Sequence, residues 1–472
     1  MAAIAQQQER IDAQHAYGRL TARERLDTLF DEASLSEVGI VGDGVVTASG
    51  MIAGRPAFAF SQDVIDADGL VTRRHAEKIT TLIDRAIEAG APIIGLYDSP
   101  GASLNDGLKV LGTQAAMMGR QALASGVVPQ LALLFGRSAG ANALAPPLAD
   151  FVFMHAASTL YLAGPDVVRA ATGELASAEL LGGPALHAAQ TGIADAIFAN
   201  EIDMLFAARE LVDLLPSTAA GEPRHRQSPD SSDRESPGLD TIIPLDPEAP
   251  YDVREVIRAV VDEQHSFELQ AEHAANLRCV FARIEGRTIG IVASQPLILG
   301  GAIDGAAARK AARFVRLCDA FGMPIVTLVD SPGFVPGIAE EPAGIVRHAA
   351  ALLAAYAQAT VPLITIVTRR ALGSAWAVLA PKPLGACACY AWPGAEIAAM
   401  GGHAAAERMF GNEEDEKRRD YAARIADLGH AVAAGLVDAV IRPAATRATI
   451  ARALRQAAGD QSSPPSPNGA GQ

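Results

Sequence analysis

The chain carries an internal repeat that spans most of its 472 residues. The stretch GAPIIGLYDSPG at residues 90–101 returns as GMPIVTLVDSPG at residues 322–333. The same offset of 232 or 233 residues relates further pairs, namely Gly54 and Gly286, Gln62 and Gln295, Lys78 and Lys310, and Pro129 and Pro362. So constant an offset indicates a tandem duplication. The sequence therefore predicts two copies of one fold, at roughly residues 21–205 and 252–445.

The segment between the two copies differs from both in composition. It reads PSTAAGEPRHRQSPDSSDRESPGLD, rich in Pro, Ser and charged residues, and the C-terminal GDQSSPPSPNGAGQ has the same character. Such segments bury too little apolar surface to order themselves strongly. We therefore predict an N-terminal extension, a first domain, a linker, a second domain and a disordered tail, at residues 1–20, 21–213, 214–245, 246–456 and 457–472.

Each copy alternates short hydrophobic runs with helical stretches. In the first copy the runs are PAFAFSQD, PIIGLYD and PQLALLFG, and RHAEKITTLIDRAIEAG is a helical stretch. This alternation is typical of an α/β domain with a largely buried sheet. Half of the residues are apolar and a fifth are charged, as in well-packed globular proteins.

Charge and hydropathy exclude two classes of partner. The net charge of −15 and the lack of a basic block disfavour a nucleic-acid backbone. The N-terminal MAAIAQQQERIDAQ lacks the pattern of a signal peptide, and the longest apolar run, Ala349–Val367, is broken by Gln358 and Pro362. We expect a cytoplasmic protein that binds neither nucleic acid nor a membrane. The cysteines, at 279, 318, 387 and 389, suit neither a zinc site nor a redox pair, so we expect core residues and no metal.

Two strands in each copy are followed by glycine-containing loops. The first loop is DSPG in both copies, and the second is GRSAGANA in one copy and TRRALGSAWA in the other, with Gly140 aligned to Gly373. Two backbone N–H groups that point at one spot form an oxyanion hole, which stabilises a developing enolate by roughly 2.7–4 kcal/mol per donor. The alternative is that the glycines only permit tight turns. Their paired placement favours two oxyanion holes.

The second loop of the first copy also matches the G-x-S-x-G pattern of serine hydrolases. Ser138 would be the nucleophile, and Asp166 and His187 follow in the order that an α/β-hydrolase triad needs. In the second copy, however, Ala371 stands in place of Ser138 while the glycine is kept. Because the duplication preserves the turn and not the hydroxyl, the pattern disfavours hydrolysis.

The chain resembles the carboxyltransferase β subunits of biotin-dependent acyl-CoA carboxylases, of the propionyl-CoA carboxylase β type, and the related methylmalonyl-CoA decarboxylase α subunits. The resemblance covers nearly the whole chain outside the linker and tails. Among the motifs that carry it are LTARERLDTLFDE, GDGVVTASGMIAGRPAFAFSQD, VASQPLILGGAIDGAAARKAARFVRLCDAFGMPIVTLVDSPGFVPG and YAWPGAEIAAMG.

The resemblance implies a fold, an assembly and a reaction. The fold would be two crotonase-like ββα superhelix domains in tandem, and the assembly a homohexamer with active sites between the first domain of one chain and the second of another. A carboxyl group would move from carboxybiotin to the α-carbon of an acyl-CoA, through an enolate. Since the chain has no P-loop and no Met-Lys-Met biotin acceptor, a biotin carboxylase and a biotin carrier are expected as separate partners.

The resemblance also implies the site residues. Gly140 and Ala141 would donate amides to the enolate of the coenzyme A thioester, and Ser374 and Ala375 would hold the ureido oxygen of biotin, with no side-chain base. Further substrate-binding residues would be Gly101, Ala102, Gly164, Gly333, Phe334, Trp376 and Ala377.

Several positions depart from the family pattern. The usual glycine pairs read Gly140-Ala141 and Gly373-Ser374, an arginine has become Ser103, and the pair that helps set acyl size reads Trp376-Ala377. An extended insertion is nearly absent between Gly39 and Asp43. The acyl group therefore stays open among acetyl, propionyl and larger groups. A decarboxylase or transcarboxylase subunit, a crotonase-type hydratase and an inactive crotonase-fold scaffold are the alternatives.

Other polar residues are assigned structural roles. Arg73, Arg74 and Lys78 are predicted to lie on a solvated helix face rather than against CoA phosphates. His187 is predicted to be a hydrogen-bonded core histidine. Asp98 and Asp330 are predicted to cap turns, because Asp followed by Ser-Pro-Gly is strong turn chemistry.

Overall fold

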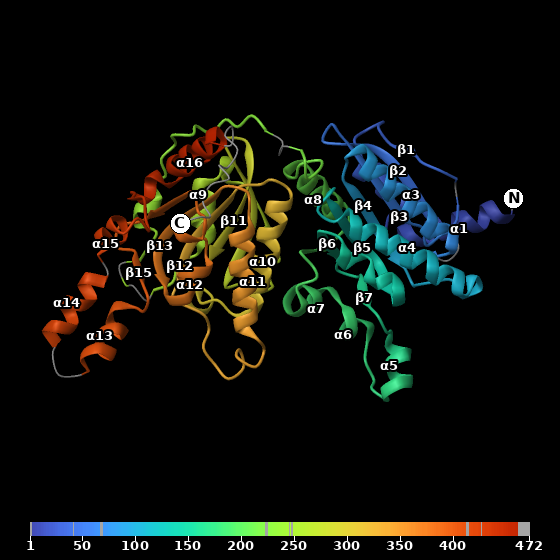
Figure 1. Ribbon diagram of the computed structural model, residues 1–472. Coiled ribbons are helices and arrows are strands. Elements are labelled where there is room, and N and C mark those ends of the chain that lie inside the picture. Colours follow the sequence, from blue (N-terminus) through green and yellow to red (C-terminus); the bar gives the residue numbers. More distant parts are fainter. Residues whose placement is uncertain are drawn as a thin grey trace, which may run out of the picture. The chain divides into compact units, whose positions relative to one another are not determined.

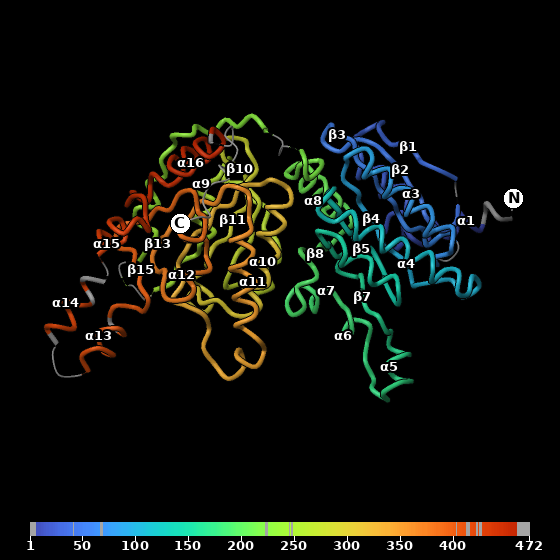
Figure 2. Tube along the Cα trace, viewed as in Figure 1, coloured from blue at the N-terminus to red at the C-terminus, as the bar shows by residue number. Residues whose placement is uncertain are grey.

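The computed structural model describes residues 2–40, 42–66, 69–221, 225–244, 246, 249–411, 415–425 and 427–460. The chain forms two compact units (Figures 1 and 2). Unit 1 comprises Met1–Arg224 with Gln270–His273, and unit 2 comprises His225–Leu269 with Ala274–Gln472. Within the described residues no helix is long and apolar enough to cross a membrane.

Unit 1 is built on one sheet of eight strands in the order β1-β2-β3-β4-β5-β6-β8, with β7 paired to β5. The first three strands are antiparallel, and the pairs from β3 onward are parallel. The strands are β1 Ser36–Glu37, β2 Val45–Ile52, β3 Arg55–Gln62, β4 Ile93–Ser99, β5 Gln130–Ala139, β6 Phe151–His155, β7 Thr159–Tyr161 and β8 Ala196–Phe198. The α-helices are α1 Ala2–Ala16, α2 Ala22–Leu29, α3 Arg73–Ala89, α4 Leu108–Ala124, α5 Pro165–Thr172, α6 Ala178–Gly182, α7 Pro184–Leu186 and α8 Glu201–Leu214.

Unit 2 is built on a sheet of the same design, in the order β16-β14-β13-β12-β11-β10-β9, with β15 paired to β13. The strands are β9 Ser266–Leu269, β10 Leu277–Ile284, β11 Arg287–Ser294, β12 Ile325–Ser331, β13 Leu363–Leu372, β14 Ala388–Ala391, β15 Glu396–Ala398 and β16 Ala439–Val440. The α-helices are α9 Val253–Val260, α10 Gly305–Ala320, α11 Ile345–Gln358, α12 Gly373–Val378, α13 Gly402–Phe410, α14 Asp415–Ile425, α15 Leu428–Ala433 and α16 Thr446–Asp460.

The two sheets agree in detail, which confirms the predicted duplication. Each has a register shift at the carboxyl end of its fourth strand, between Tyr97 and Ser99 in β4 and between Val329 and Ser331 in β12. An isolated bridge joins the loop after each of these strands to a residue earlier in the chain, Ala102 to Val71 in unit 1 and Phe334 to Ile303 in unit 2. The repeat therefore preserves the loops after the strands as well as the strands themselves.

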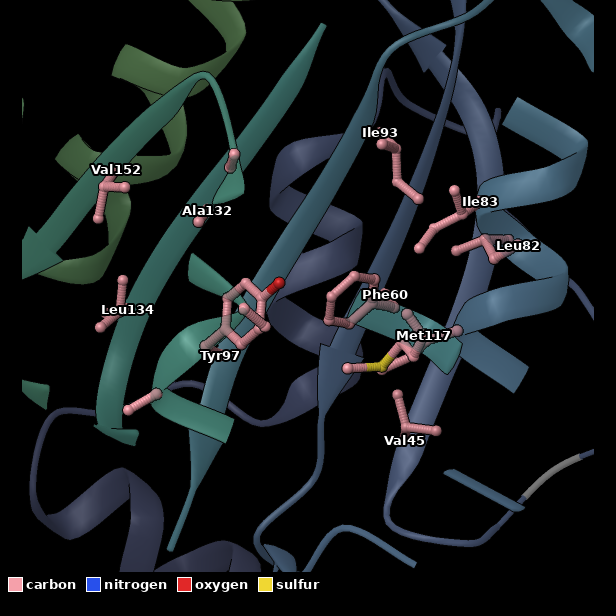
Figure 3. Packing of buried hydrophobic residues seen from close by; sticks show 14 of the residues in the cluster. Val45, Phe60, Leu82, Ile83, Ile93, Tyr97, Met117, Ala132, Leu134 and Val152 are labelled. Atoms are coloured by element: carbon pink, nitrogen blue, oxygen red, sulfur yellow. The ribbon is translucent and has the colours of Figure 1, made fainter. Parts of the chain in front are cut away.

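The core of unit 1 lies between the sheet and helices α3 and α4, on one face. Side chains alternate along β5, so Ala132 and Leu134 face this layer while the intervening residues face α2 and α8. Figure 3 shows the Phe60 ring beside Met117, and Phe60 meets Tyr97 edge to face with ring centroids 5.3 Å apart. Helices on both faces explain why the central strands are nearly continuous hydrophobic runs.

The predicted linker and tail are described in part. Residues 225–244 belong to unit 2, where Leu239 is buried and the N–H of Ser236 donates to the carbonyl of Ala444 at 2.9 Å. In the predicted tail, residues 457–460 belong to α16 and residues 461–472 lie outside the described residues. The domain boundaries stay a prediction.

Candidate active site

In unit 1 the two glycine loops meet at the carboxyl ends of β4 and β5. Parallel strands end at the same edge of a sheet, where α/β folds hold their ligands. Gly101, in the loop after β4, has φ 129°, and a Cβ placed on it would lie 3.4 Å from the carbonyl oxygen of Ala139. The structure therefore brings Gly101 next to the turn that begins at Gly140. Ala102 pairs with Val71 beside it.

The turn after β5 requires glycine at its first position. Gly140 has φ 62°, a left-handed conformation that costs an L-residue roughly 1–2 kcal/mol. It opens a short 3₁₀-helix, Gly140–Leu144. The first turn of a helix has N–H groups without partners inside the helix. Gly140 and Ala141 are both partly exposed, so their amides stand in such a turn at the sheet edge.

A hollow of about 480 Å³ lies next to this turn in unit 1. Leu144, Tyr161 and His187 are among its lining residues. The predicted Gly164 precedes α5, and a Cβ placed on it would lie 3.3 Å from the Tyr161 ring. Gly164 therefore contacts Tyr161, a lining residue, but does not itself line the hollow. Gly101 and Ala102 follow β4, which pairs with β5 on the side opposite β7.

In unit 2 the corresponding loops form a hollow of about 460 Å³. Three predicted residues line it together, Phe334, Ser374 and Ala377. Gly333 precedes Phe334 with φ 141°, and Gly373 begins α12 with φ 56°. The opposite wall is apolar and comes mainly from α11, with Ile345, Val346, Ala349, Ala350 and Leu353.

Two other predicted residues of α12 do not line this hollow. Ala375 is fully buried, and Trp376 is half-buried. Both lie on α12 directly after Ser374, which is exposed.

Asp98 does not cap a turn, and that prediction is wrong. Its carboxylate accepts hydrogen bonds from Arg19 at 2.9 Å and from Arg25 at 3.2 Å. Arg25 is 1 % exposed, also pairs with Glu201 at 2.8 Å, and lies over the Phe135 ring. Burial of a charge is tolerated only with such partners, so the aspartate anchors the end of β4 to α2 and α8.

The prediction for Asp330 is wrong for a related reason. Its carboxylate accepts from Nε of Arg369 at 2.9 Å and from Nε of Arg370 at 3.1 Å, both on the neighbouring strand β13. The residue of unit 1 that aligns with Arg369 is Gly136, and a Cβ placed on Gly136 would lie 2.0 Å from Oδ1 of Asp98. The two copies thus neutralise the same aspartate from different elements.

Lys78 does not lie on a solvated helix face. Its ammonium donates to the carbonyls of Gly42 at 2.7 Å and Val45 at 2.8 Å, and burial lowers its pKa. Lys310 donates in the same way to Leu277 at 2.9 Å. The repeated lysine therefore holds the start of a strand. Arg73 and Arg74 are exposed, as predicted.

His187 is a hydrogen-bonded buried histidine, as predicted. Its ring nitrogens lie 2.9 Å from Oγ1 of Thr191 and 2.8 Å from the carbonyl of Leu160. Ser138 instead bonds within its own turn, to Asn142. No recorded contact joins Ser138 to His187 among the described residues, so the hydrolase alternative loses its geometric basis.

Three cysteines, Cys279, Cys318 and Cys389, are buried as predicted, and burial raises the pKa of each of the last two. Cys387 is exposed, and its thiol donates to the carbonyl of Leu363 at 3.1 Å, so the prediction is wrong for this residue. It lies just before β14, at the end of the sheet away from the glycine loops.

The sequence reasoning missed a group of buried polar side chains beneath the Gly140 turn. Oε1 of Gln62 accepts from the N–H of Asp98 at 2.9 Å, and Nε2 of Gln62 lies 3.3 Å from Nε2 of His75 and 3.4 Å from Oδ1 of Asn142. Burial lowers the pKa of His75 to about 3, so its ring is neutral. Gln62 belongs to the repeat, which was a signal that it holds something in place.

Known proteins resemble this chain over nearly its whole length. A family model described as carboxyl transferase domain matches residues 13–468. The chain belongs to the carboxyl transferase domain family. The propionyl-CoA carboxylase beta chain of Roseobacter denitrificans is 43% identical over 470 residues, with 95% of this chain and 92% of the relative covered. The methylmalonyl-CoA decarboxylase subunit alpha of Veillonella parvula is 38% identical over 466 residues, with coverage of 95% and 92%.

Solved structures of the carboxyl transferase family have the same fold. Transcarboxylase 12S superposes with a TM-score of 0.93 at 38% identity, and the match covers 98% of this chain and 94% of that one. The resemblance, the tandem crotonase-like α/β fold and the carboxyltransferase function expected from the sequence are thereby confirmed.

Proposed function

We propose that this carboxyltransferase moves a carboxyl group between biotin, carried by a separate protein, and the α-carbon of a short acyl-CoA of the acetyl or propionyl type. The observation that carries the proposal is the pair of equivalent turns, at Gly140 and Gly373, each with left-handed φ at the end of the fifth strand of its sheet. A reaction between two carbonyl compounds needs two such pockets.

In unit 1 the amides of Gly140 and Ala141 are proposed to bind the thioester oxygen. Negative charge develops on this oxygen when the α-proton leaves, and backbone N–H groups held in a rigid turn stabilise it without reorganisation. The neighbouring Gly101 keeps the approach to the turn free of a side chain. Positioning and electrostatics then supply the catalysis, in keeping with a turn that presents backbone rather than titratable groups.

In unit 2 the residues fit a biotin ring system. The hollow is walled by the apolar side chains of α11, which suit the thiophane ring, and Ser374 offers a polar atom at its edge. Ser374 and Ala375 are proposed to hold the ureido oxygen through their amides, the second from its buried place inside the turn. When bound, biotin supplies or accepts the carboxyl group. Phe334 and Ala377 are proposed to border the same ligand.

The direction of transfer has a second candidate. The relative from Veillonella parvula is named as a decarboxylase subunit, at nearly the identity of the carboxylase relatives. A decarboxylase or transcarboxylase subunit would use the same pockets and run the same transfer in reverse.

The assembly and partners are part of the proposal. Transcarboxylase 12S is described as a hexamer, and we propose a homohexamer for this chain as well. A biotin carboxylase and a biotin carrier protein are the proposed partners. A cytoplasmic location stays a prediction from the sequence, and the mammalian relatives are named as mitochondrial.

The transfer itself tests the proposal. Purified full-length protein is mixed with methylmalonyl-CoA and free biotin, and propionyl-CoA is followed by chromatography. We expect propionyl-CoA and carboxybiotin only when biotin is present. Malonyl-CoA serves as an alternative donor in a parallel reaction, in which acetyl-CoA is the product followed. Folded protein that transfers no carboxyl group from either donor would support the inactive scaffold, and turnover of an enoyl-CoA without biotin would support a hydratase.

A further inference from the structure

Four buried polar side chains form a chain of contacts beneath the proposed thioester turn. His75 comes from α3, Gln62 from the end of β3, Ser138 from the end of β5, and Asn142 from the 3₁₀-helix that follows. Each is at most 1 % exposed. Gln62 contacts both His75 and Asn142. Buried polar groups are costly unless paired, so these contacts fix four elements, α3, β3, β5 and the 3₁₀-helix, relative to one another.

The contacts at Asn142 close around the turn. Nδ2 of Asn142 donates to Oγ of Ser138 at 3.1 Å, and Oγ of Ser138 donates to the backbone carbonyl of Asn142 at 3.3 Å. Residues 138 and 142 bracket Gly140 and Ala141. Gly140 and Ala141, whose amides are proposed to bind the thioester oxygen, therefore lie inside a loop that is closed by side-chain hydrogen bonds.

The second copy lacks this support. The positions that align with His75, Ser138 and Asn142 hold Ala307, Ala371 and Ala375. Gln295, the counterpart of Gln62, donates instead to Oδ1 of Asp252 at 2.6 Å. A glycine with left-handed φ also begins the helix after β13, although that helix is α rather than 3₁₀, so the glycine turn forms without these polar side chains. These hydrogen-bonded polar side chains therefore belong to the first copy alone, and we look for their role in the reaction at that copy's turn.

We propose that Asn142 is a positioning residue for carboxyl transfer, which acts through Ser138 to hold the amides of Gly140 and Ala141 at one angle. The inference rests on the proposed function, in which these amides bind the thioester oxygen. Asn142 is 1 % exposed, so its role in this proposal is indirect. Nε2 of Gln62 donates to the side-chain oxygen of Asn142, and His75 contacts the same Nε2, so Gln62 keeps the amide group of Asn142 turned toward Ser138.

The test exchanges residues between the copies. Asn142→Ala and Ser138→Ala each install the residue of the second copy, and both are assayed for biotin-dependent loss of methylmalonyl-CoA. We expect kcat to fall about tenfold or more while KM for the CoA ester stays within about threefold, since a misdirected oxyanion donor is felt mainly in the transition state. The double variant should lose little more than the worse single variant, because both act as one unit.

Gln130→Leu is the matched control. Gln130 is equally buried, lies at the far end of β5, and aligns with Leu363 in the second copy. It should lose stability but keep kcat. Amide hydrogen exchange in residues 138–144 gives a readout apart from activity, and it should quicken in Asn142→Ala and not in Gln130→Leu.

Three outcomes separate the possibilities. If the wild-type protein has no transfer activity, the proposed function is contradicted. Hydrogen exchange then tests only whether Asn142 rigidifies residues 138–144, and unchanged exchange in Asn142→Ala contradicts that role. Active wild type with kcat of folded Asn142→Ala within twofold overturns the inference. If that variant does not fold, the same criteria apply to Ser138→Ala.

Discussion

Nε of Arg369 donates to the carboxylate of Asp330 at 2.9 Å, and this pair joins the ends of β12 and β13 inside unit 2. Both side chains are buried. These strand ends carry Gly333 and Gly373, so the ion pair sets the spacing of the two loops that border the unit 2 hollow.

Asp330→Asn should destabilise the protein by about 3–5 kcal/mol, because it leaves buried guanidinium charge without a counter-ion. Denaturant unfolding measures the loss. Glu235→Gln breaks an exposed pair with Arg442 and should cost no more than about 1 kcal/mol. Equal losses in the two variants would contradict the role given to Asp330.

Gly136→Ala should also destabilise the protein strongly. Its Cβ would lie 2.0 Å from Oδ1 of Asp98 and 2.7 Å from Nη2 of Arg19, so a buried ion pair must open. Gly119→Ala is the control, since Gly119 lies in α4 with open space around it and should gain up to about 1 kcal/mol from helix propensity. Thermal unfolding compares the two. If Gly136→Ala is as stable as wild type, the Asp98–Arg19 ion pair accommodates a methyl group, which contradicts its close packing against Gly136.

His75 should make unfolding depend on pH. Burial, with a smaller contribution from Lys78, lowers its pKa to about 3, whereas an unfolded histidine takes up a proton near about 6.5. Between these values the unfolded chain binds the extra proton, so the free energy of unfolding falls as pH falls, by up to about 1.4 kcal/mol per unit. Above pH of about 6.5 the residue adds no pH dependence.

Urea unfolding of His75→Gln at several pH values checks this slope. The variant should lose less stability than wild type between about pH 6.5 and pH 4.5. His225→Gln, at an exposed residue, should keep the wild-type slope. A wild-type slope in His75→Gln would mean that the buried ring titrates normally.

The repeat was enough to predict the two sheets and the paired turns, because one offset aligned Gly140 with Gly373 and DSPG with DSPG. The partners of Asp98 were beyond local reasoning. Arg19 and Arg25 lie 79 and 73 residues away in sequence, and only the packing of α2 against the sheet brings them in. Turn chemistry therefore predicted a local role that long-range charge overrode.

A signal for these misses lay in the differences between the copies. Gly136 aligns with Arg369, and Asn142 aligns with Ala375. A glycine that aligns with an arginine of the other copy indicates that another side chain occupies the arginine's place. An asparagine that aligns with an alanine indicates that the asparagine has a polar partner in its own copy. Such mismatches inside an otherwise faithful repeat are where the two copies have taken up different tasks.

The central claim is that the two copies serve different ligands, and the KM values of two glycine variants test it most directly. In biotin-dependent transfer, Gly140→Ala should raise KM for methylmalonyl-CoA about fivefold, because its methyl group would enter the open space where the thioester is proposed to bind, and leave KM for biotin within about twofold. Gly373→Ala should do the reverse, and Gly54→Ala, at another left-handed glycine with open space around it, should change neither. If both variants raise the same KM, the division of labour between the copies is contradicted.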